Sequence, residues 1–271
     1  MNGAPLNKPQ PNMPKFSIAI VNYKTLDLTR ICLELLKKHF EAGQLDKNQV
    51  DVWVVDNDSQ DASTEYLRAQ DWIHLIERQP TEVEKGYVAH GKALDLILES
   101  IHTDYCFLLH TDTFIYNANV FAWLLKPCLA DSNVVAAGCL EQLNRGYART
   151  AWRVTSRFVK YHSRRLRLSL GLGAREPKPY LEAYIKSFCA LWNVKWMKQH
   201  GLSFLMADRI PGYELQDIVR AKGYKMHLVS PMRLFKYLDH VEAGTVGLVS
   251  GYSDVNRRSK RKKSILKKLN S

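Results

Sequence analysis

The chain has 271 residues, of which 46% are hydrophobic, and it carries a formal net charge of +12 at pH 7. This length and apolar content favour one large folded domain and argue against a fibrous or disordered protein. The sequence holds no apolar stretch of about 18 residues, and prolines and asparagines stand where a secretory signal has its apolar segment. We therefore expect a cytoplasmic protein.

The five cysteines are odd in number, widely spaced and mostly surrounded by apolar residues. No pair has the close spacing of a redox or zinc motif. We expect all five to be reduced residues of the core.

Most of the basic charge lies in two segments. Residues 145–175 contain nine basic residues, residues 257–268 contain eight, and neither segment contains an acid. The combined positive charge of the two segments exceeds the net charge of +12, so the rest of the chain is mildly acidic. Local basic segments of this kind bind polyanions, either nucleic acid or the anionic face of a membrane.

Taken in chain order, the first half alternates between strand and helix patterns. After a Pro/Asn-rich leader at 1–15, which we expect to be disordered, residues 16–23 predict a strand. Apolar residues at helical spacing follow from Leu28 to Leu36. Further strands are predicted at 50–56, 73–78 and 104–110, with helices at 62–69 and after Gly86. This alternation predicts an α/β fold with a mostly parallel central sheet flanked by helices.

Three of the predicted strands end in polar residues. These are Asn22 and Tyr23 after the first strand, Asp56, Asn57 and Asp58 after the second, and His110, Thr111 and Asp112 after the fourth. Any one of these ends is typical of an ordinary hydrogen-bonded loop. In a parallel sheet, however, the carboxyl ends of the strands share one edge, where ligands bind. A buried carboxylate there costs several kcal/mol unless it is paired, hydrogen-bonded or bound to a metal.

The second half has a different character. Residues 145–175 place arginines at four-residue spacing beside apolar side chains, which predicts an amphipathic helix with a basic stripe. Residues 179–202 are rich in aromatic side chains, and residues 208–229 combine an acid cluster with an amphipathic helix that ends at Gly223. His240 is isolated, and an isolated histidine is more often structural than a ligand.

The motifs SIAIVNYKTLDLTRICLELL, VVDNDSQDAS, GYVAHGKAL and LLHTDT follow one another in this order, with GYK and His240 further on. In this order they resemble the inverting family-2 glycosyltransferases, which have the GT-A (nucleotide-diphospho-sugar transferase) fold. The resemblance covers residues 16–245 and is stronger in the first half. It implies a nucleotide-sugar-binding α/β half at 16–140, a helical acceptor-side half of the same domain at 141–250, and a basic tail at 251–271.

The resemblance also implies roles for individual residues on the donor side. The nucleotide base and ribose are assigned to Val21, Asn22, Tyr23 and Asp56, with Asn57, Asp58, Gly86, Lys92 and Thr111 close to the donor. Lys92 either adds positive charge near the diphosphate or is a solvated helix lysine. His90 is a further candidate for contact with the sugar or the diphosphate.

The segment LLHTDT matches the metal-binding position of the family. Asp112 is the implied ligand of Mn²⁺ or Mg²⁺, His110 replaces the first acid, and His240 stands where the family has a C-terminal metal-binding histidine. A histidine suits Mn²⁺ better than Mg²⁺, which prefers oxygen ligands.

The catalytic base of an inverting transfer removes the proton of the acceptor hydroxyl. The adjacent Glu-Asp pair of the family is absent here, so we favour Glu214, with Asp208 second and Asp217 third. Asp217 also fits a simple ion pair on a helix face. Trp192 and Asn193 fall at acceptor-site positions of the family, although a core tryptophan fits equally well.

The leading hypothesis is therefore an inverting glycosyltransferase of cell-surface polysaccharide synthesis. It would move a sugar from a nucleotide-diphosphate sugar to a glycan or lipid-linked acceptor, at the inner face of the plasma membrane. Segments 145–175 and 257–268 would hold it against the anionic membrane surface.

Two alternatives remain. A basic nucleic-acid-binding protein leaves the three polar strand ends unexplained, so we expect no nucleic acid partner. A sugar nucleotidyltransferase usually has a glycine-rich loop after its first strand, and VNYKTLDLTR contains no glycine.

Overall fold

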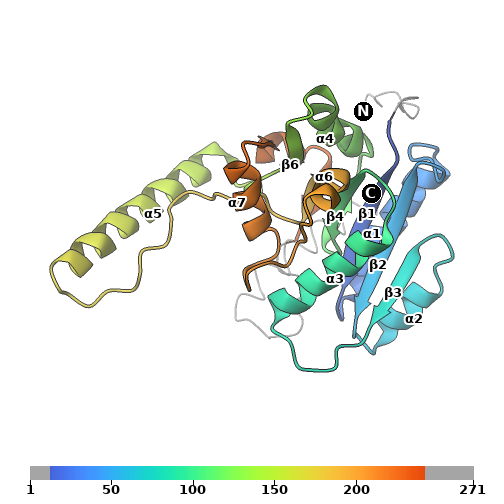
Figure 1. The fold of residues 1–271 in the computed structure, drawn as a ribbon, viewed down its shortest axis with the longest axis horizontal. Helices are drawn as coiled ribbons and strands as arrows, with labels where there is room; N and C mark the ends of the chain where they lie inside the picture. The colour runs from blue at the N-terminus through green and yellow to red at the C-terminus, as the bar shows by residue number, and fades with distance from the viewer. Residues whose placement is uncertain (1–12, 242–271) are drawn as a thin grey trace.

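The structure, a computed structural model, describes residues 13–241 and contains one large mixed sheet and one small ribbon (Figure 1). The strands are β1 (Phe16–Asn22), β2 (Val50–Asn57), β3 (His74–Arg78), β4 (Tyr105–His110), β5 (Thr113–Ile115), β6 (Val134–Gly138), β7 (Cys189–Asn193), β8 (Lys225–Leu228) and β9 (Leu238–His240). The helices are α1 (Leu26–Glu41), α2 (Ala62–Arg68), α3 (Gly86–Ser100), α4 (Asn119–Ala130), α5 (Gly146–Ser169), α6 (Val194–Gln199), α7 (Tyr213–Ala221) and α8 (Pro231–Leu234).

The large sheet has seven strands in the order β3-β2-β1-β4-β7-β6-β8. Strands β3, β2, β1 and β4 are parallel, and β8 is parallel to β6, whereas β7 runs antiparallel to both of its neighbours. The predicted α/β architecture with a mostly parallel sheet is confirmed. The strands predicted in the first half and the helix at 62–69 form within one residue of their expected bounds, whereas α1 extends five residues beyond Leu36.

The second half contributes more to the sheet than its helical pattern suggested. Strand β7 lies inside the aromatic-rich segment and is inserted between β4 and β6. Its sequence, CALWN, is buried on both faces, so it lacks the alternation that identifies a half-exposed strand. The two predicted halves therefore share one sheet.

Helices cover the sheet on both sides and give two hydrophobic cores. On one side, Phe16, Ile18 and Ile20 of β1 pack with apolar residues of α1, α2 and α4. On the other side, Ala19 of β1 and Val55 of β2 pack with apolar residues of α3, α6 and α7. Successive side chains of a strand point to opposite faces, so β1 serves both cores. Trp192 is 2% exposed within the second core, as its structural reading expects.

All five cysteines are buried and free, as expected from their surroundings. Met13 packs against the first core, so the end of the predicted leader is ordered. Residues 1–12 of the leader, 242–250 of the acceptor-side half and the whole basic tail lie outside the described residues. Within 13–241, no helix combines the length and the apolar character needed to cross a bilayer.

The predicted basic helix forms as α5, which is 24 residues long. It extends from the body as an arm, and the chain returns along it before β7 (Figure 1). Two ion pairs join the base of the arm to this returning segment and to the loop before α5. Arg153 lies 2.9 Å from Glu182 and 2.8 Å from Glu141.

Candidate active site

The three polar strand ends meet at one edge of the sheet, as predicted. Strand β1 lies between β2 and β4, and its register pairs Asn22 with Asp56 and Val21 with His110. The turns that follow these strands therefore lie side by side. Parallel pairing places them together because all three strands run in the same direction.

Asn22 joins the end of β1 to the turn after β2. Its side-chain amide donates to Asp56 Oδ1 at 2.7 Å and also lies within hydrogen-bond distance of Ser59 and Ser63. Its side-chain oxygen accepts from Thr29 at 2.6 Å. Asn22 is fully buried, so it does not line the cleft; its hydrogen bonds instead hold the residues beneath the cleft in place.

Asp56 is likewise occupied by internal hydrogen bonds. Besides Asn22, Ser59 donates to its Oδ1 at 2.5 Å and Thr64 donates to its Oδ2 at 2.8 Å. The carboxylate is 3% exposed and faces a smaller pocket of 330 Å³ that it shares with Asp58. The compensation that a buried carboxylate requires is thus supplied by the chain itself.

A cleft of 780 Å³ opens beside the strand ends. Nine of the predicted site residues line it: Val21, Tyr23, Asn57, Asp58, Gly86, Thr111, His110, Asp112 and His240. They come from the ends of β1, β2 and β4, from the start of α3 and from β9. The cleft therefore collects residues that are far apart in the sequence.

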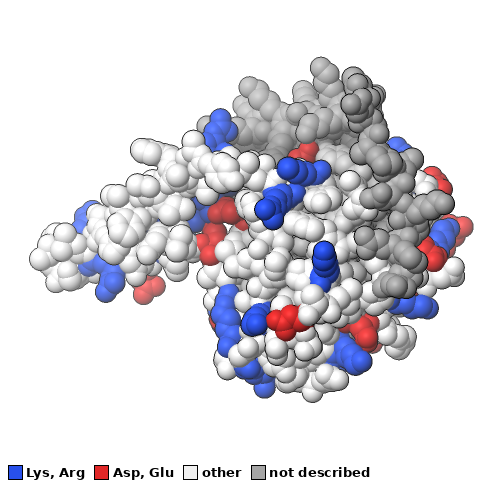
Figure 2. Space-filling view, turned by 90° about the horizontal axis from the view of Figure 1, so that it is seen from above, with Lys and Arg blue, Asp and Glu red and all other residues white. Residues whose placement is uncertain are grey.

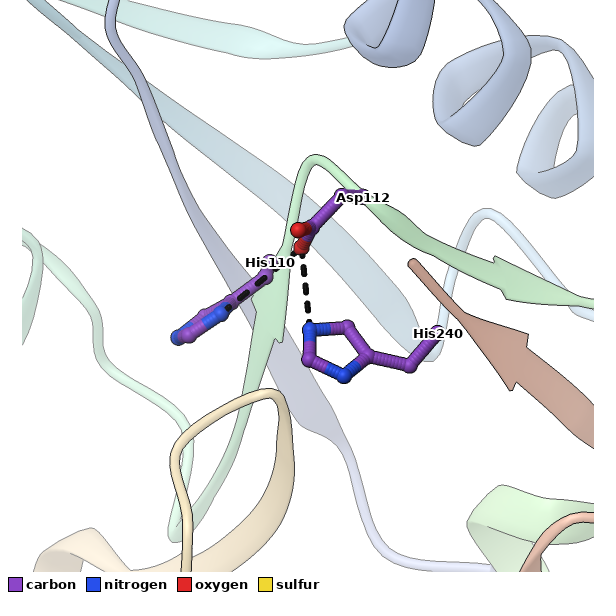
Figure 3. Close-up of side chains that lie close together, drawn as sticks. All are labelled: His110, Asp112 and His240. Carbon is purple, nitrogen blue, oxygen red and sulfur yellow. Dashed lines mark ion pairs between the residues drawn. The ribbon is translucent and has the colours of Figure 1, made fainter. Parts of the chain in front are cut away.

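His110, Asp112 and His240 form a compact group in this cleft (Figure 3). Each offers one ligand atom, and these atoms lie within 4.8 Å of one another. The small ribbon brings His240 here, because β9 pairs antiparallel with β5 and sets His240 opposite Thr113. The Val241 amide also donates to the Asp112 carbonyl oxygen at 3.0 Å.

The hydrogen bond of His240 fixes the chemistry of its ring. Nδ1 lies 3.0 Å from the Gln142 carbonyl oxygen, which can only accept, so Nδ1 carries a proton. In the neutral ring, Nε2 then presents a lone pair, and it lies 3.1 Å from Asp112 Oδ1 without forming a hydrogen bond. Two electron-rich atoms at this distance fit a cation held between them. A histidine whose second nitrogen donates to a carbonyl is also the usual arrangement of a metal ligand.

His110 completes the group from the end of β4. Its Nε2 lies 2.9 Å from Ser187 Oγ, which leaves Nδ1 facing Asp112 at 3.8 Å. Burial lowers the pKa of His110 below its ordinary value; Asp112 opposes this shift, and the nearby His90 and His240 rings add to it. The ring is therefore neutral at pH 7, as a metal ligand must be.

The cleft also contains residues that the sequence did not single out. Arg78 is a cation in the cleft wall, where it donates to Asn57 at 2.8 Å and pairs with Glu84 at 2.6 Å. Gln142 and Ser187 orient the two metal-site histidines. No local pattern marks these residues, because β7 and the loop after β6 reach the cleft only through tertiary folding.

His90, a candidate from the sequence, lines the cleft, and burial lowers its pKa to about 4.

Lys92 is not among the described residues that line the cleft. Its ammonium group pairs with Glu84 at 2.7 Å, and its side chain is 52% exposed. The structure thus favours the solvated-lysine reading. Asn193 caps α6 by accepting from the Trp196 amide at 2.9 Å, which is also a structural role.

The three candidate bases lie in α7 and in the loop before it, but none of them is among the described residues that line the cleft. Glu214, in the first turn of α7, pairs with Arg209. Asp217 pairs with Arg209 at 2.9 Å and with Arg220 at 2.7 Å. Partial burial acts to raise the pKa of Asp217, but the hydrogen bonds from Arg209 and Tyr184 outweigh it and lower the pKa.

Asp208 has different surroundings. It accepts a hydrogen bond from Tyr87 at 2.9 Å, and its side chain is 72% exposed. Its φ of 49° and the φ of 53° at Ala207 are left-handed values, which are uncommon for residues with a side chain. Tyr87 follows Gly86 at the start of α3, so Asp208 contacts the helix that forms one wall of the cleft.

The loop that carries Asp208 packs closely on α3. Asp95 of α3 accepts from the amides of Phe204 and Leu205 at 2.6 and 3.0 Å. A Cβ atom at Gly91 would lie only 2.8 Å from Leu205 and 2.9 Å from Pro211. The glycine therefore permits an approach that a larger residue would prevent.

Comparison with known proteins identifies the architecture. No family model and no curated protein matches the chain. Among solved structures, a mannosyltransferase from Pyrobaculum calidifontis in complex with GDP-Man and Mn²⁺ matches 84% of this chain and 58% of its own, with 15% identity and a TM-score of 0.55. Glucosyl-3-phosphoglycerate synthase from Mycobacterium tuberculosis, in complex with Mn²⁺, UDP and phosphoglyceric acid, matches 79% of this chain and 67% of its own, with 16% identity and a TM-score of 0.50.

The chain spans 58% of the length of the mannosyltransferase, so the likeness concerns the shared core. The chain therefore has the GT-A fold of the nucleotide-diphospho-sugar transferases.

Proposed function

We propose that the protein is an inverting, metal-dependent glycosyltransferase that takes a hexose or related sugar from a nucleotide-diphosphate donor. The observation that carries this proposal is the His110, Asp112 and His240 group in the cleft. Its donor set, one carboxylate oxygen and two imidazole nitrogens, suits Mn²⁺. The two similar solved proteins bind Mn²⁺ and a GDP-sugar or UDP, which supports the same ligands here.

On the donor side, we assign the nucleotide to the wall formed by Val21, Tyr23, Asn57 and Asp58. Asp56 and Asn22 hold this wall in place through their buried hydrogen bonds. Arg78 supplies a positive charge in the same cleft, and Thr111 and Gly86 complete the donor site. These contacts would orient the donor so that its anomeric carbon faces the acceptor side.

Asp112, His110 and His240 would hold a divalent cation, which stabilises the negative charge that collects on the departing nucleotide diphosphate. Gln142 and Ser187 keep the two rings oriented toward Asp112. With His110 held neutral by its lowered pKa, Asp112 would be the negatively charged ligand of the group.

On the acceptor side, a carboxylate accepts the proton of the attacking hydroxyl while the bond from that oxygen to the anomeric carbon forms and the bond to the diphosphate breaks. Glu214 is the first choice by sequence. The contacts raise Asp208 above it, because Glu214 and Asp217 both pair with Arg209, whereas Asp208 is 72% exposed and its ion pair with Lys85 spans 3.9 Å. Strained backbone of the kind found at Asp208 also tends to occur at functional sites.

The acceptor is proposed to be a glycan or lipid-linked precursor of a cell-surface polysaccharide, reached from the cytoplasmic side of the membrane. The basic helix α5 supports this part of the proposal, because it offers a surface for anionic lipids beside the acceptor side.

A panel of UDP, GDP, dTDP and CMP with and without Mn²⁺ tests the donor site by thermal stabilisation. A ligand at about 100 times its dissociation constant adds about 2.7 kcal/mol to the free energy of unfolding. We expect at least one nucleotide to raise the melting temperature, more strongly with Mn²⁺. If no nucleotide shifts it, the donor-site assignment is wrong.

Three isosteric variants, Asp208→Asn, Glu214→Gln and Asp217→Asn, test the base. The variant that loses the base stops sugar transfer and keeps the nucleotide-induced stabilisation of the wild type. A general base contributes about 10²–10⁴-fold to the rate, which sets the expected loss. A nucleotidyltransferase would instead release pyrophosphate from a nucleoside triphosphate, and detection of that product would favour the alternative.

A further inference from the structure

Helix α5 carries large apolar side chains that no other part of the described chain, residues 13–241, covers. None of its 24 residues, all of which the structure describes, is buried. Trp152, Val159 and Leu166 are 76%, 59% and 61% exposed. Exposed apolar residues gathered on one element indicate a surface for another molecule.

These three residues form a single row along the helix. They are seven residues apart, which is close to two turns, so their side chains lie above one another. Arg149, Lys160 and Arg167 form a second row about a quarter of a turn around the helix from the first, because they are eleven and seven positions apart, which is close to whole numbers of turns. Within residues 13–241, none of these three basic side chains pairs with an acid.

The other side of α5 is tied to the returning chain. The Phe158 and Tyr161 rings contact Tyr180, with ring centroids 5.2 and 5.5 Å apart. Arg157 pairs with Glu182 at 2.8 Å. The arm thus has one internally satisfied side and one side that offers an apolar row and a basic row to the surroundings. Figure 2 shows Lys and Arg side chains on the arm amid a largely uncharged surface.

We propose that this exposed side of α5, the docking face, lies flat on an anionic phospholipid bilayer. The apolar row enters the interfacial layer, and the basic row contacts lipid phosphates. At 1.5 Å per residue the helix offers a contact line of about 36 Å. It is not apolar enough to cross a bilayer, so it rests on the surface.

Charge complementarity favours a bilayer over other occupants. A second copy of this chain would bring the same basic row, and the like charges would repel. Nucleic acid would satisfy the basic row but leave Trp152, Val159 and Leu166 in water. An anionic bilayer satisfies both rows at once.

Docking would also orient the cleft. Helix α5 begins four residues after Gln142, whose carbonyl group holds His240 at the metal site. The surface is separate from the cleft, so this proposal does not depend on the proposed sugar transfer. If that function holds, the arm presents the acceptor side of the cleft to lipid-linked substrates.

Vesicle sedimentation with the full chain tests the docking face. The vesicles contain phosphatidylcholine with phosphatidylglycerol, and pure phosphatidylcholine vesicles serve as the uncharged comparison. We expect binding to the anionic vesicles only. The charge variant Arg149→Gln, Lys160→Gln, Arg167→Gln should lower the partition coefficient roughly 100-fold, since each basic residue near the surface contributes about a fivefold change.

The apolar variant Trp152→Ser, Val159→Ser, Leu166→Ser should lower partitioning at least about 10-fold, because it removes the side chains that enter the interface. The matched control Lys37→Gln, Lys38→Gln, Lys47→Gln removes the same charge from exposed positions on the body and should bind like the wild type. Circular dichroism confirms that each variant folds, and nucleotide-induced stabilisation, which tests the cleft separately, should stay unchanged in all three.

Several outcomes overturn the proposal. They are wild-type binding to neither vesicle, unchanged binding of the apolar variant, or equal losses in the charge variant and its control. Tighter binding to duplex DNA or RNA than to vesicles, or a dimer that the apolar variant dissociates, would assign the face to one of the other occupants.

Discussion

At the scale of single residues, one hydrogen bond orients the ring of His240, the proposed metal ligand, toward Asp112. The Gln142 carbonyl holds the proton on Nδ1, so the lone pair of Nε2 faces the Asp112 carboxylate. With side-chain exposures of 1% and 6%, solvent does little to screen the two groups from each other. A cation held between the two groups would stabilise this arrangement and would account for the polar cluster at the end of β4.

Replacing Asp112 with Ala should abolish the metal-dependent part of nucleotide binding. The variant loses the one charged ligand of the group, so Mn²⁺ no longer bridges the chain and the diphosphate. The measurement is the melting temperature with the best nucleotide, with and without Mn²⁺. The Asp51→Ala variant, which removes a half-buried carboxylate near the start of β2, should retain the full difference. A metal-dependent shift in melting temperature that persists in Asp112→Ala would contradict the assignment of Asp112 as a metal ligand.

Replacing His110 with Asp should shift the metal preference from Mn²⁺ toward Mg²⁺. The change adds a carboxylate oxygen, the ligand type that Mg²⁺ prefers, in place of an imidazole nitrogen. Nucleotide-induced stabilisation measured in each metal reports the preference. An unchanged ratio between the two metals would mean that His110 does not touch the ion and that Asp112 and His240 carry it.

At the scale of elements, the site depends on joints, meaning buried hydrogen bonds and close contacts that connect neighbouring strands and helices. Asn22 links β1 to β2, α2 and α1, since its partners Asp56, Ser63 and Thr29 belong to these elements. The joint fixes the wall on which we place the nucleotide. A second joint, at Asp95 and Gly91, holds the Asp208 loop on α3.

Replacing Asn22 with Ala should lower the free energy of unfolding by about 3 kcal/mol. The change leaves the buried Asp56 carboxylate and Thr29 hydroxyl without one of their partners and opens a small cavity. Urea unfolding measures the loss. Asn48→Ala is the control, because the Asn48 side chain is exposed and bonds only to Asp46 among the described residues, so its loss should stay within about 0.5 kcal/mol. Equal losses of unfolding free energy in the two variants would show that the hydrogen bonds of Asn22 do not stabilise the fold.

The Asp95 joint should make stability depend on pH. Burial raises the pKa of Asp95 from 3.8 to about 6, although the amides of Phe204 and Leu205 oppose the shift. The folded chain therefore binds this proton more tightly than the unfolded chain, and the stability that Asp95 contributes falls as pH rises between about 4 and 6. Relative to Asp95→Asn, which does not titrate, the wild type should lose about 1 kcal/mol across this window, after allowance for the partial exposure of the group.

Urea unfolding of both proteins at several pH values checks this prediction. A constant difference between the wild type and Asp95→Asn from pH 4 to 7 would show that the pKa of Asp95 is not raised.

At the scale of the whole molecule, charge is divided between a mildly acidic body and two basic segments. One of these is the α5 arm, and the other, at residues 257–268, lies beyond the described part of the chain. This division would separate the cleft proposed for the anionic donor from the basic surfaces proposed to bind an anionic membrane.

Binding to anionic vesicles should therefore weaken steeply with salt. The Debye length falls from about 10 Å at 0.1 M to about 3 Å at 1 M salt, which screens exposed charges. Vesicle sedimentation across this range measures the dependence, and removal of residues 257–271 should reduce both the binding and its salt sensitivity. Binding that ignores both changes would contradict the electrostatic contribution of the tail.

Much of the fold was predictable from local patterns. The strands and helices up to β4 have apolar spacing that a two- or 3.6-residue period explains. Strand β7 was not predictable, because a short run buried on both faces has no period, and its antiparallel insertion depends on β6 already lying nearby. The ribbon of β5 and β9 joins residues more than 120 positions apart, and no short pattern encodes such a pairing.

The sequence by itself determined that three polar strand ends would share one edge, because parallel strands leave no other arrangement for them. It also identified Asp112 as a carboxylate in need of a partner, and it identified the basic helix. Only the tertiary structure decided that His240 meets Asp112, that Gln142 and Ser187 orient the two rings, and that Asn22 and Lys92 lie outside the cleft. The physical reason is distance along the chain: local sequence sets periodicity and strand direction, whereas side chains far apart in sequence meet only when long-range packing brings their elements together.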